Sequence, residues 1–149
     1  MVALFALWRT FAAPTVALRT TLVRELAQLR VELAALGKQI PFGLQSRQRV
    51  SSALGTGGGN LEIFKRETET DLAEVHTIES QVGDMDGVVR WISSYADMEE
   101  KAKEVTSART RAKQLADKYA AAFAKDEADR AFIRESVTQR AARQMERGN

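Results

Sequence analysis

An apolar stripe runs along the N-terminal third of the chain. Leucines recur in alternating steps of four and three residues, and Ile40 closes the series. This spacing places one apolar side chain on the same helix face at every turn, and such a face packs on a second helix. The pattern therefore predicts a partner-helix interface formed by Leu22, Leu26, Leu29, Leu33 and Leu36.

The stripe continues more weakly toward the N-terminus, so residues 1–41 are expected to form an N-terminal amphipathic helix. Pro14 suits the first turn of the main helix, and a single helix kinked at Pro14 is the alternative. Gly37 and Pro41 predict the end of this helix, because proline disfavours helical geometry at the residue before it.

The next segment, residues 42–60, is expected to be a flexible linker. It ends in the glycine-rich run GTGGGN, which favours a mobile chain over a packed element. A nucleotide-binding loop is not expected there, since such a loop needs a preceding strand and a following Lys-Ser/Thr pair.

Helical periodicity returns over residues 61–149, with a break expected near 83–87. In that break Gly83 suits a helix C-cap, and Asp84 or Asp86 suits the next N-cap. The apolar stripe that follows turns alanine-rich toward the C-terminus. No stretch alternates apolar and polar residues in the manner of a strand.

The fold class predicted from these patterns is all-α. Long kinked helices would form a hairpin or an extended, coiled-coil-like rod, with a compact three-helix bundle as the alternative. Charge is distributed in blocks: the net charge is +5 over residues 1–60, −8 over 61–100 and +5 over 101–149. An acidic middle between basic ends favours antiparallel pairing of the segments.

The head of the chain carries no acidic residue before Glu25. Its charges are Arg9, Arg19 and Arg24, set among apolar and threonine residues. This composition is typical of a mitochondrial targeting segment or of a helix that lies in a membrane interface. The run Arg9-Thr10-Phe11 followed by two alanines resembles a matrix-processing site, and whether the segment is cleaved stays open.

Catalytic chemistry is not expected. The chain has no cysteine and a single histidine, His76. The DMDG run at residues 84–87 fails as a calcium loop, because Val82 and Ser93 fall where carboxylate ligands are required. The sequence therefore predicts a protein that is not an enzyme, with no cofactor and no metal site.

Two tryptophans and a group of C-terminal arginines are the remaining candidates for contacts. Trp8 and Trp91 are candidate interface anchors, since tryptophan is enriched at binding hot spots. Candidate anionic contacts are Arg130, Arg134, Arg140, Arg143 and Arg147. These arginines are interleaved with glutamates and lack an aromatic ladder, so nucleic acid is not the expected partner.

The leading hypothesis is a non-catalytic accessory subunit of a mitochondrial inner-membrane complex, such as a respiratory complex or ATP synthase. Its partners would be other protein subunits, with peripheral lipid contact through the N-terminal helix. The alternatives are a cytosolic coiled-coil adaptor or tether and an RNA-associated helical subunit of a mitochondrial ribosome. Which complex, which neighbours and which stoichiometry stay open.

Overall fold

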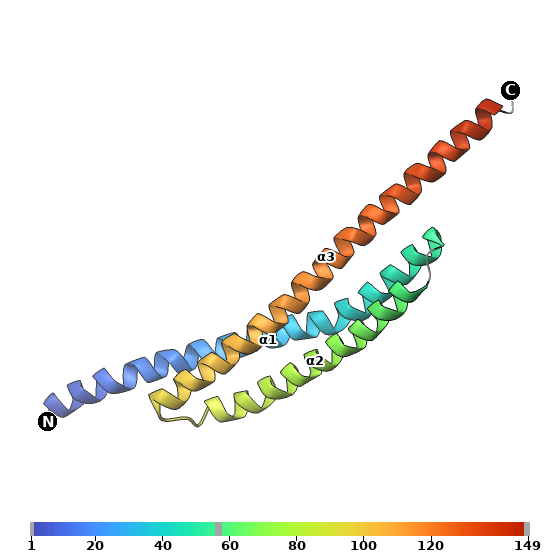
Figure 1. Ribbon diagram of the computed structural model, residues 1–149. Coiled ribbons are helices and arrows are strands. Elements are labelled where there is room, and N and C mark those ends of the chain that lie inside the picture. The colour runs from blue at the N-terminus through green and yellow to red at the C-terminus, as the bar shows by residue number, and fades with distance from the viewer. Residues whose placement is uncertain (1, 56–57, 148–149) are drawn as a thin grey trace. The chain divides into compact units, whose positions relative to one another are not determined.

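The computed structural model describes residues 2–55 and 58–147, with side chains described from Pro14 to Met145 outside the 56–57 gap. This part of the chain forms three helices and no strand: α1 is Val2–Leu54, α2 is Gly59–Val89 and α3 is Tyr95–Arg147 (Figure 1). The all-α class predicted from the sequence is confirmed. The helices divide into two compact units, and each helix contributes residues to both.

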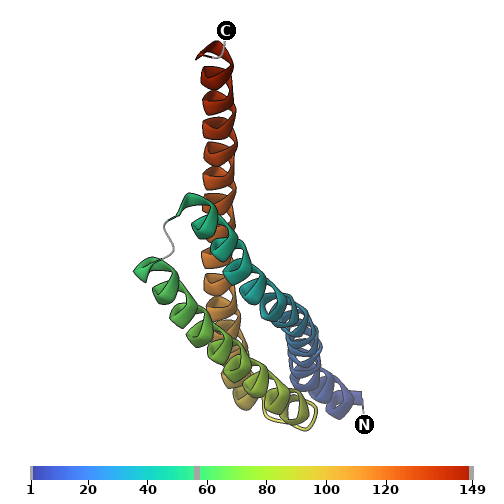
Figure 2. The ribbon, with the colours of Figure 1, turned by 90° about the vertical axis from the view of Figure 1, so that its right-hand side faces the viewer.

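Unit 1 comprises residues 1–37 and 73–115. Its segments of α1, α2 and α3 lie side by side (Figure 2). Arg30 of α1 lies 3.4 Å from Asp86 of α2, and Arg19 donates to the backbone carbonyl of Ile92, which fixes α1 antiparallel to α2. The core consists of the leucine stripe of α1 together with Val75, Ile78, Val82, Met85 and Val89 of α2 and Met98, Val105, Ala108, Ala112 and Leu115 of α3.

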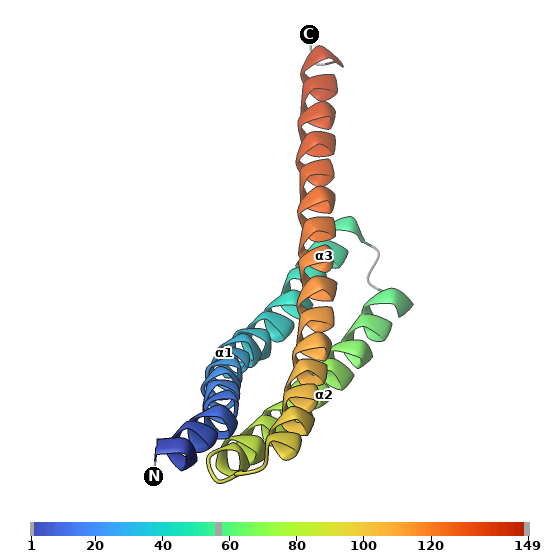
Figure 3. The ribbon, with the colours of Figure 1, turned by 90° about the vertical axis from the view of Figure 1, so that its left-hand side faces the viewer.

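Unit 2 comprises residues 38–72 and 116–149. Phe42 packs against Phe123 with ring centroids 5.7 Å apart, and Ser46 contacts Asp126, so α1 and α3 run parallel here. Tyr119 packs edge-on against Phe64 of α2 at 6.3 Å. Helix α3 continues past the end of α1 (Figure 3). Its side chains from Val137 to Met145 are exposed.

Three boundaries expected from the sequence need correction. Helix α1 does not end at Gly37–Pro41, and helix replaces most of the expected linker of 42–60, since α1 runs to Leu54. An internal proline costs a helix about 3 kcal/mol. That cost is offset because Ile40, Gly43, Ser46 and Val50 continue the buried stripe on both sides of Pro41.

Between α1 and α2, Gly55 and Gly58 are the non-helical residues that the structure describes. Gly55 has a φ of 67°, and its backbone N–H donates to the carbonyl of Ser52 at 3.3 Å. A residue in this left-handed conformation after the last turn is the usual helix stop, and glycine adopts it without a Cβ penalty.

The break expected at 83–87 is also misplaced. Both of its glycines lie inside α2, because Val82, Met85 and Val89 stay buried on one stripe through that region. The chain turns instead at residues 90–94. Ser94 then caps α3, with its Oγ accepting from the Asp97 backbone N–H at 3.4 Å.

Gly43 lies against the ring of Tyr119, so a Cβ at this position would approach Tyr119 Cδ1 to 2.9 Å. We expect Gly43→Ala to lower the free energy of unfolding by about 1 kcal/mol. Overpacking costs about 1–3 kcal/mol, and the better helix propensity of alanine returns about 1 kcal/mol. Urea unfolding followed by circular dichroism measures the change.

Gly37→Ala is the matched control, because no atom lies within 4 Å of a Cβ added there. It should raise the free energy of unfolding by about 0.5–1 kcal/mol. An equal gain in both variants would show that Tyr119 does not pack on Gly43.

Candidate functional site

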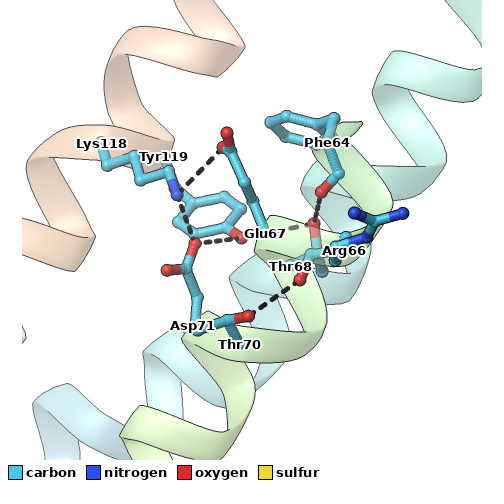
Figure 4. Close-up of polar contacts among 8 residues, drawn as sticks. All are labelled: Phe64, Arg66, Glu67, Thr68, Thr70, Asp71, Lys118 and Tyr119. Atoms are coloured by element: carbon cyan, nitrogen blue, oxygen red, sulfur yellow. Dashed lines mark hydrogen bonds and ion pairs between the residues drawn. The ribbon is translucent and has the colours of Figure 1, made fainter. Parts of the chain in front are cut away.

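One group of connected polar side chains in unit 2 lies where α2 meets α3 (Figure 4). The Tyr119 hydroxyl donates to Asp71 Oδ2 at 3.0 Å and lies 3.5 Å from Thr68 Oγ1. Lys118 Nζ donates to the same Asp71 oxygen at 2.7 Å and lies 3.2 Å from Glu67 Oε2. We call Glu67, Thr68, Asp71, Lys118 and Tyr119 the tyrosine cluster.

The electrostatics of the tyrosine cluster hold both of its titratable donors in the protonated state. Burial raises the pKa of Tyr119 to about 12, and the charge of Asp71 adds to this effect. Desolvation lowers the pKa of Lys118, but hydrogen bonds to Asp71 and Glu67 outweigh it and leave the pKa above 10.5. A general acid or base works best with a pKa near the operating pH. This cluster is therefore suited to holding α2 against α3 and not to proton transfer.

A second polar group lies in the α1–α3 contact of unit 2. Asp126 and Ser46 are buried, with 1% and 4% of their surfaces exposed. The Ser46 hydroxyl donates to Asp126 Oδ2 at 2.6 Å and accepts from Arg130 Nη2 at 2.7 Å. Arg47 Nη2 lies 2.9 Å from Asp126 Oδ1, and its other terminal nitrogen lies 3.6 Å from Asp129. We call Ser46, Arg47, Asp126, Asp129 and Arg130 the aspartate cluster.

The aspartate cluster occupies positions that the apolar stripes would otherwise fill. A buried carboxylate is costly unless it is paired, and here one serine and one arginine pair it. Because the partners lie on different helices, the contact is satisfied in only one axial register of α1 on α3. Its role is to select that register, as buried polar residues do in helical assemblies.

The predicted contact residues differ in burial and in location. Leu22, Leu26, Leu29, Leu33 and Leu36 are all buried, and they pack within unit 1 of the same chain. Trp91 lies in the α2–α3 turn with 88% of its surface exposed. The side chain of Trp8 lies outside the described residues.

The candidate arginines are not brought together into one site. Arg130 contacts Ser46, and Arg134 lies 3.0 Å from Glu127. Hydrogen bonds from these two guanidinium groups lower the pKa of the Glu127 carboxyl, and Arg134 has the larger effect. Arg140 and Arg143 are exposed, and the side chain of Arg147 lies outside the described residues.

Other chemistry-bearing groups in the described part of the chain are dispersed. The side chain of His76 is 75% exposed and contacts only Glu79, at 3.2 Å. No group of three or more possible metal ligands occurs among the described residues. An open groove between α2 and α3 in unit 1 is lined partly by Lys101, Glu104 and Arg111. These charges already pair, with Lys101 on Glu104 at 2.6 Å and Arg111 Nε on Glu74 at 2.6 Å.

Sequence reasoning missed both polar clusters. Ser46 and Asp126 continue the three- and four-residue steps of their helices, and that periodicity could have identified them. Ending the first helix at Pro41 removed Ser46 from consideration.

No protein-family model, curated protein or solved structure matches the chain. None of the helices in the described residues contains a stretch long and apolar enough to cross a bilayer.

We expect Tyr119→Phe to remove a loss of stability at high pH. Between about pH 10 and about pH 12 the unfolded chain releases the tyrosine proton while the folded chain retains it, so the unfolding free energy falls as pH rises. The full pKa difference corresponds to at most about 3 kcal/mol. Unfolding in urea at stepped pH measures this fall.

Tyr95→Phe is the control, because Tyr95 is half exposed in the first turn of α3. A residual decline in the Tyr119→Phe variant is expected, since the pKa of Lys118 is also raised in the folded chain and its contribution to stability is lost as pH rises. Equal pH profiles for the wild type and Tyr119→Phe would contradict the raised pKa of the buried Tyr119 hydroxyl.

A second test concerns Asp126. Removing one member of a buried ion pair costs about 3–5 kcal/mol of unfolding free energy. Asp126→Ala should therefore lower the unfolding free energy by an amount at or below this range, because Arg47 keeps a second carboxylate, Asp129, nearby. The double variant Ser46→Ala, Asp126→Leu should recover most of this loss, since an apolar pair fills the space. Denaturant midpoints of the two variants give the comparison, and a single variant as stable as wild type would argue against a buried pair.

Proposed function

We propose that this protein is a non-catalytic structural subunit of an assembly on the mitochondrial inner membrane. Its long helices, paired in a coiled-coil-like manner, would bridge other subunits. The observation that carries the proposal is the head of α1, where 24 residues contain three arginines and no carboxylate. Positive charge without negative charge follows the membrane potential into mitochondria.

A structural role is supported by how the chain uses its polar side chains. The two clusters of unit 2 connect one helix to another, and Arg19, Arg30 and Arg109 make helix-to-helix or helix-to-turn contacts in unit 1. The pKa values of Lys118 and Tyr119 are both raised, so neither group exchanges its proton readily near neutral pH. Groups used in this way maintain a scaffold and leave little chemistry for a substrate.

Trp91 is the side chain best suited to anchor a neighbouring subunit. It is the most exposed of the large apolar residues described, and Arg90 beside it is also exposed. Tryptophan and arginine dominate the binding energy of protein interfaces. An indole side chain has only two rotatable bonds, so it loses little conformational entropy when a partner covers it.

The second candidate is a coiled-coil adaptor in the cytosol. It is favoured by the three- and four-residue steps of the buried stripes, which recur in all three helices. This candidate predicts helicity that rises with protein concentration in the absence of other subunits. It gives no reason for a carboxylate-free head.

The deciding experiment is size-resolved mass spectrometry of gently detergent-solubilised mitochondrial membranes. We expect the chain to comigrate with a large inner-membrane complex, with peptides from Met1–Arg9 intact. Migration as a small soluble oligomer, or absence from the membrane fraction, would replace the proposal with the adaptor.

Trp91→Ala should reduce recovery of the chain with that complex. Loss of a hot-spot tryptophan costs about 2 kcal/mol or more, which is roughly 30-fold in affinity. The thermal midpoint of the purified variant should stay unchanged, because the indole contacts little of its own chain. Met145→Ala alters a similarly exposed residue of unit 2 and is the control. Equal recovery of the wild type and Trp91→Ala would exclude Trp91 as the anchor.

A further inference from the structure

Helix α1 has a second apolar face in unit 1, on the side opposite its buried leucines. Val16, Val23 and Val31 are 56%, 36% and 71% exposed. Exposed alanines lie between and beside them at Ala27, Ala34 and Ala35. We call these six residues the outer face of α1. A helix that is apolar on both sides is normally covered on both sides.

The other two helices carry fewer exposed apolar side chains in unit 1. Val88 of α2 and Tyr95 of α3 are 47% and 50% exposed, and most of the other exposed residues are polar or charged, among them Glu79, Asp84, Glu99, Lys103 and Lys113. Exposed apolar residues are therefore denser on the outer face of α1 than on α2 or α3.

The charge nearest to the outer face is positive. Exposed Arg24 lies beside it, Arg30 at its edge pairs with Asp86 of α2, and the two carboxylates of this stretch of α1 are turned away from it. Glu32 is half-buried and lies 3.6 Å from Arg109 of α3, while Glu25 is half-buried beside the core stripe. The polar threonines are satisfied within the helix, since Thr20 and Thr21 each donate to a backbone carbonyl four residues earlier at 3.0 Å. Such threonines need no water when they enter an apolar environment.

The occupant is identified by the charge of the segment that contains the start of the face. Residues 1–24 carry Arg9, Arg19 and Arg24 and no carboxylate. An apolar face in a segment with positive charge alone is complementary to anionic lipid headgroups above an acyl-chain boundary.

We propose that the outer face of α1 lies on an anionic bilayer surface. The valines and alanines enter the boundary between headgroups and acyl chains, and Arg24 contacts lipid phosphates. The leucine face on the opposite side keeps α2 and α3 packed on the helix, away from the lipid. This inference deepens the proposed function and depends on it only for the identity of the membrane.

Vesicle flotation of the purified full chain tests the proposal. The probes are vesicles of phosphatidylcholine with and without phosphatidylglycerol. We expect binding to the anionic vesicles only, with loss of binding as salt rises from about 0.05 M to about 0.5 M, because screening shortens the range of the attraction. No binding to anionic vesicles at low salt would overturn the inference.

The double variant Val16→Glu, Val31→Glu places two carboxylates on the outer face and should lower the fraction bound at least tenfold. The matched control is Phe132→Glu, Val137→Glu, which changes two residues of α3 in unit 2 that are 65% and 59% exposed. Its binding should stay within twofold of wild type, and circular dichroism should give equal helicity for all three proteins. Equal losses in both variants would overturn the assignment to α1.

Sedimentation equilibrium without lipid separates the remaining occupant, a second copy of the chain. A dimeric mass that Val16→Glu, Val31→Glu abolishes would assign the outer face to self-association and overturn the lipid inference. A chain that comigrates with a membrane complex but never binds vesicles would lose this inference and keep the proposed function. Vesicle binding without comigration would support this inference and contradict the proposed function.

Discussion

Removal of the apolar stripes from water is the interaction on which every helix of this protein depends. Helices α1 and α3 each span 53 residues, and α2 spans 31. Such helices owe most of their stability to packing of one face and not to intrinsic propensity. Each tolerates features that would end an isolated helix, including Pro41 in α1 and two glycines in α2. The buried stripe carries α1 through Pro41 and α2 through its glycines, whereas α1 ends at the left-handed Gly55 and α3 continues past Asp126, the last of its described residues that is buried.

Apolar stripes alone would leave the helices free to slide, because neighbouring leucines offer nearly equivalent contacts one turn apart. The polar clusters of unit 2 remove that freedom. Asp126 finds both Ser46 and Arg47 only in one register, and Tyr119 reaches Asp71 only when α2 and α3 are correctly aligned. Buried polar contacts of this kind contribute little net stability and penalise the alternatives. The clusters are better understood as determinants of alignment than as sources of stability.

The sequence was sufficient for features that depend on periodicity. The all-α class and the burial of Leu22 to Leu36 follow directly from the spacing of apolar residues. The helix ends were predicted poorly, because proline and glycine were weighed as local signals while their cost is overcome by distant packing partners. The polar clusters need knowledge of which turns of α1, α2 and α3 face one another, and one sequence does not contain that pairing. The exposure of Trp91 likewise depends on where the chain turns, which falls seven residues after the glycine expected to begin the break.

The contact between Gly43 and Tyr119 links two positions that are 76 residues apart in the chain. The ring occupies the space that a side chain at position 43 would need, so a larger residue at 43 and a large ring at 119 disfavour each other. Across related sequences, a larger residue at 43 should therefore occur with a smaller one at 119, and the pair should vary together. Such covariation would be evidence, from sequences alone, that α1 and α3 are in contact at these positions.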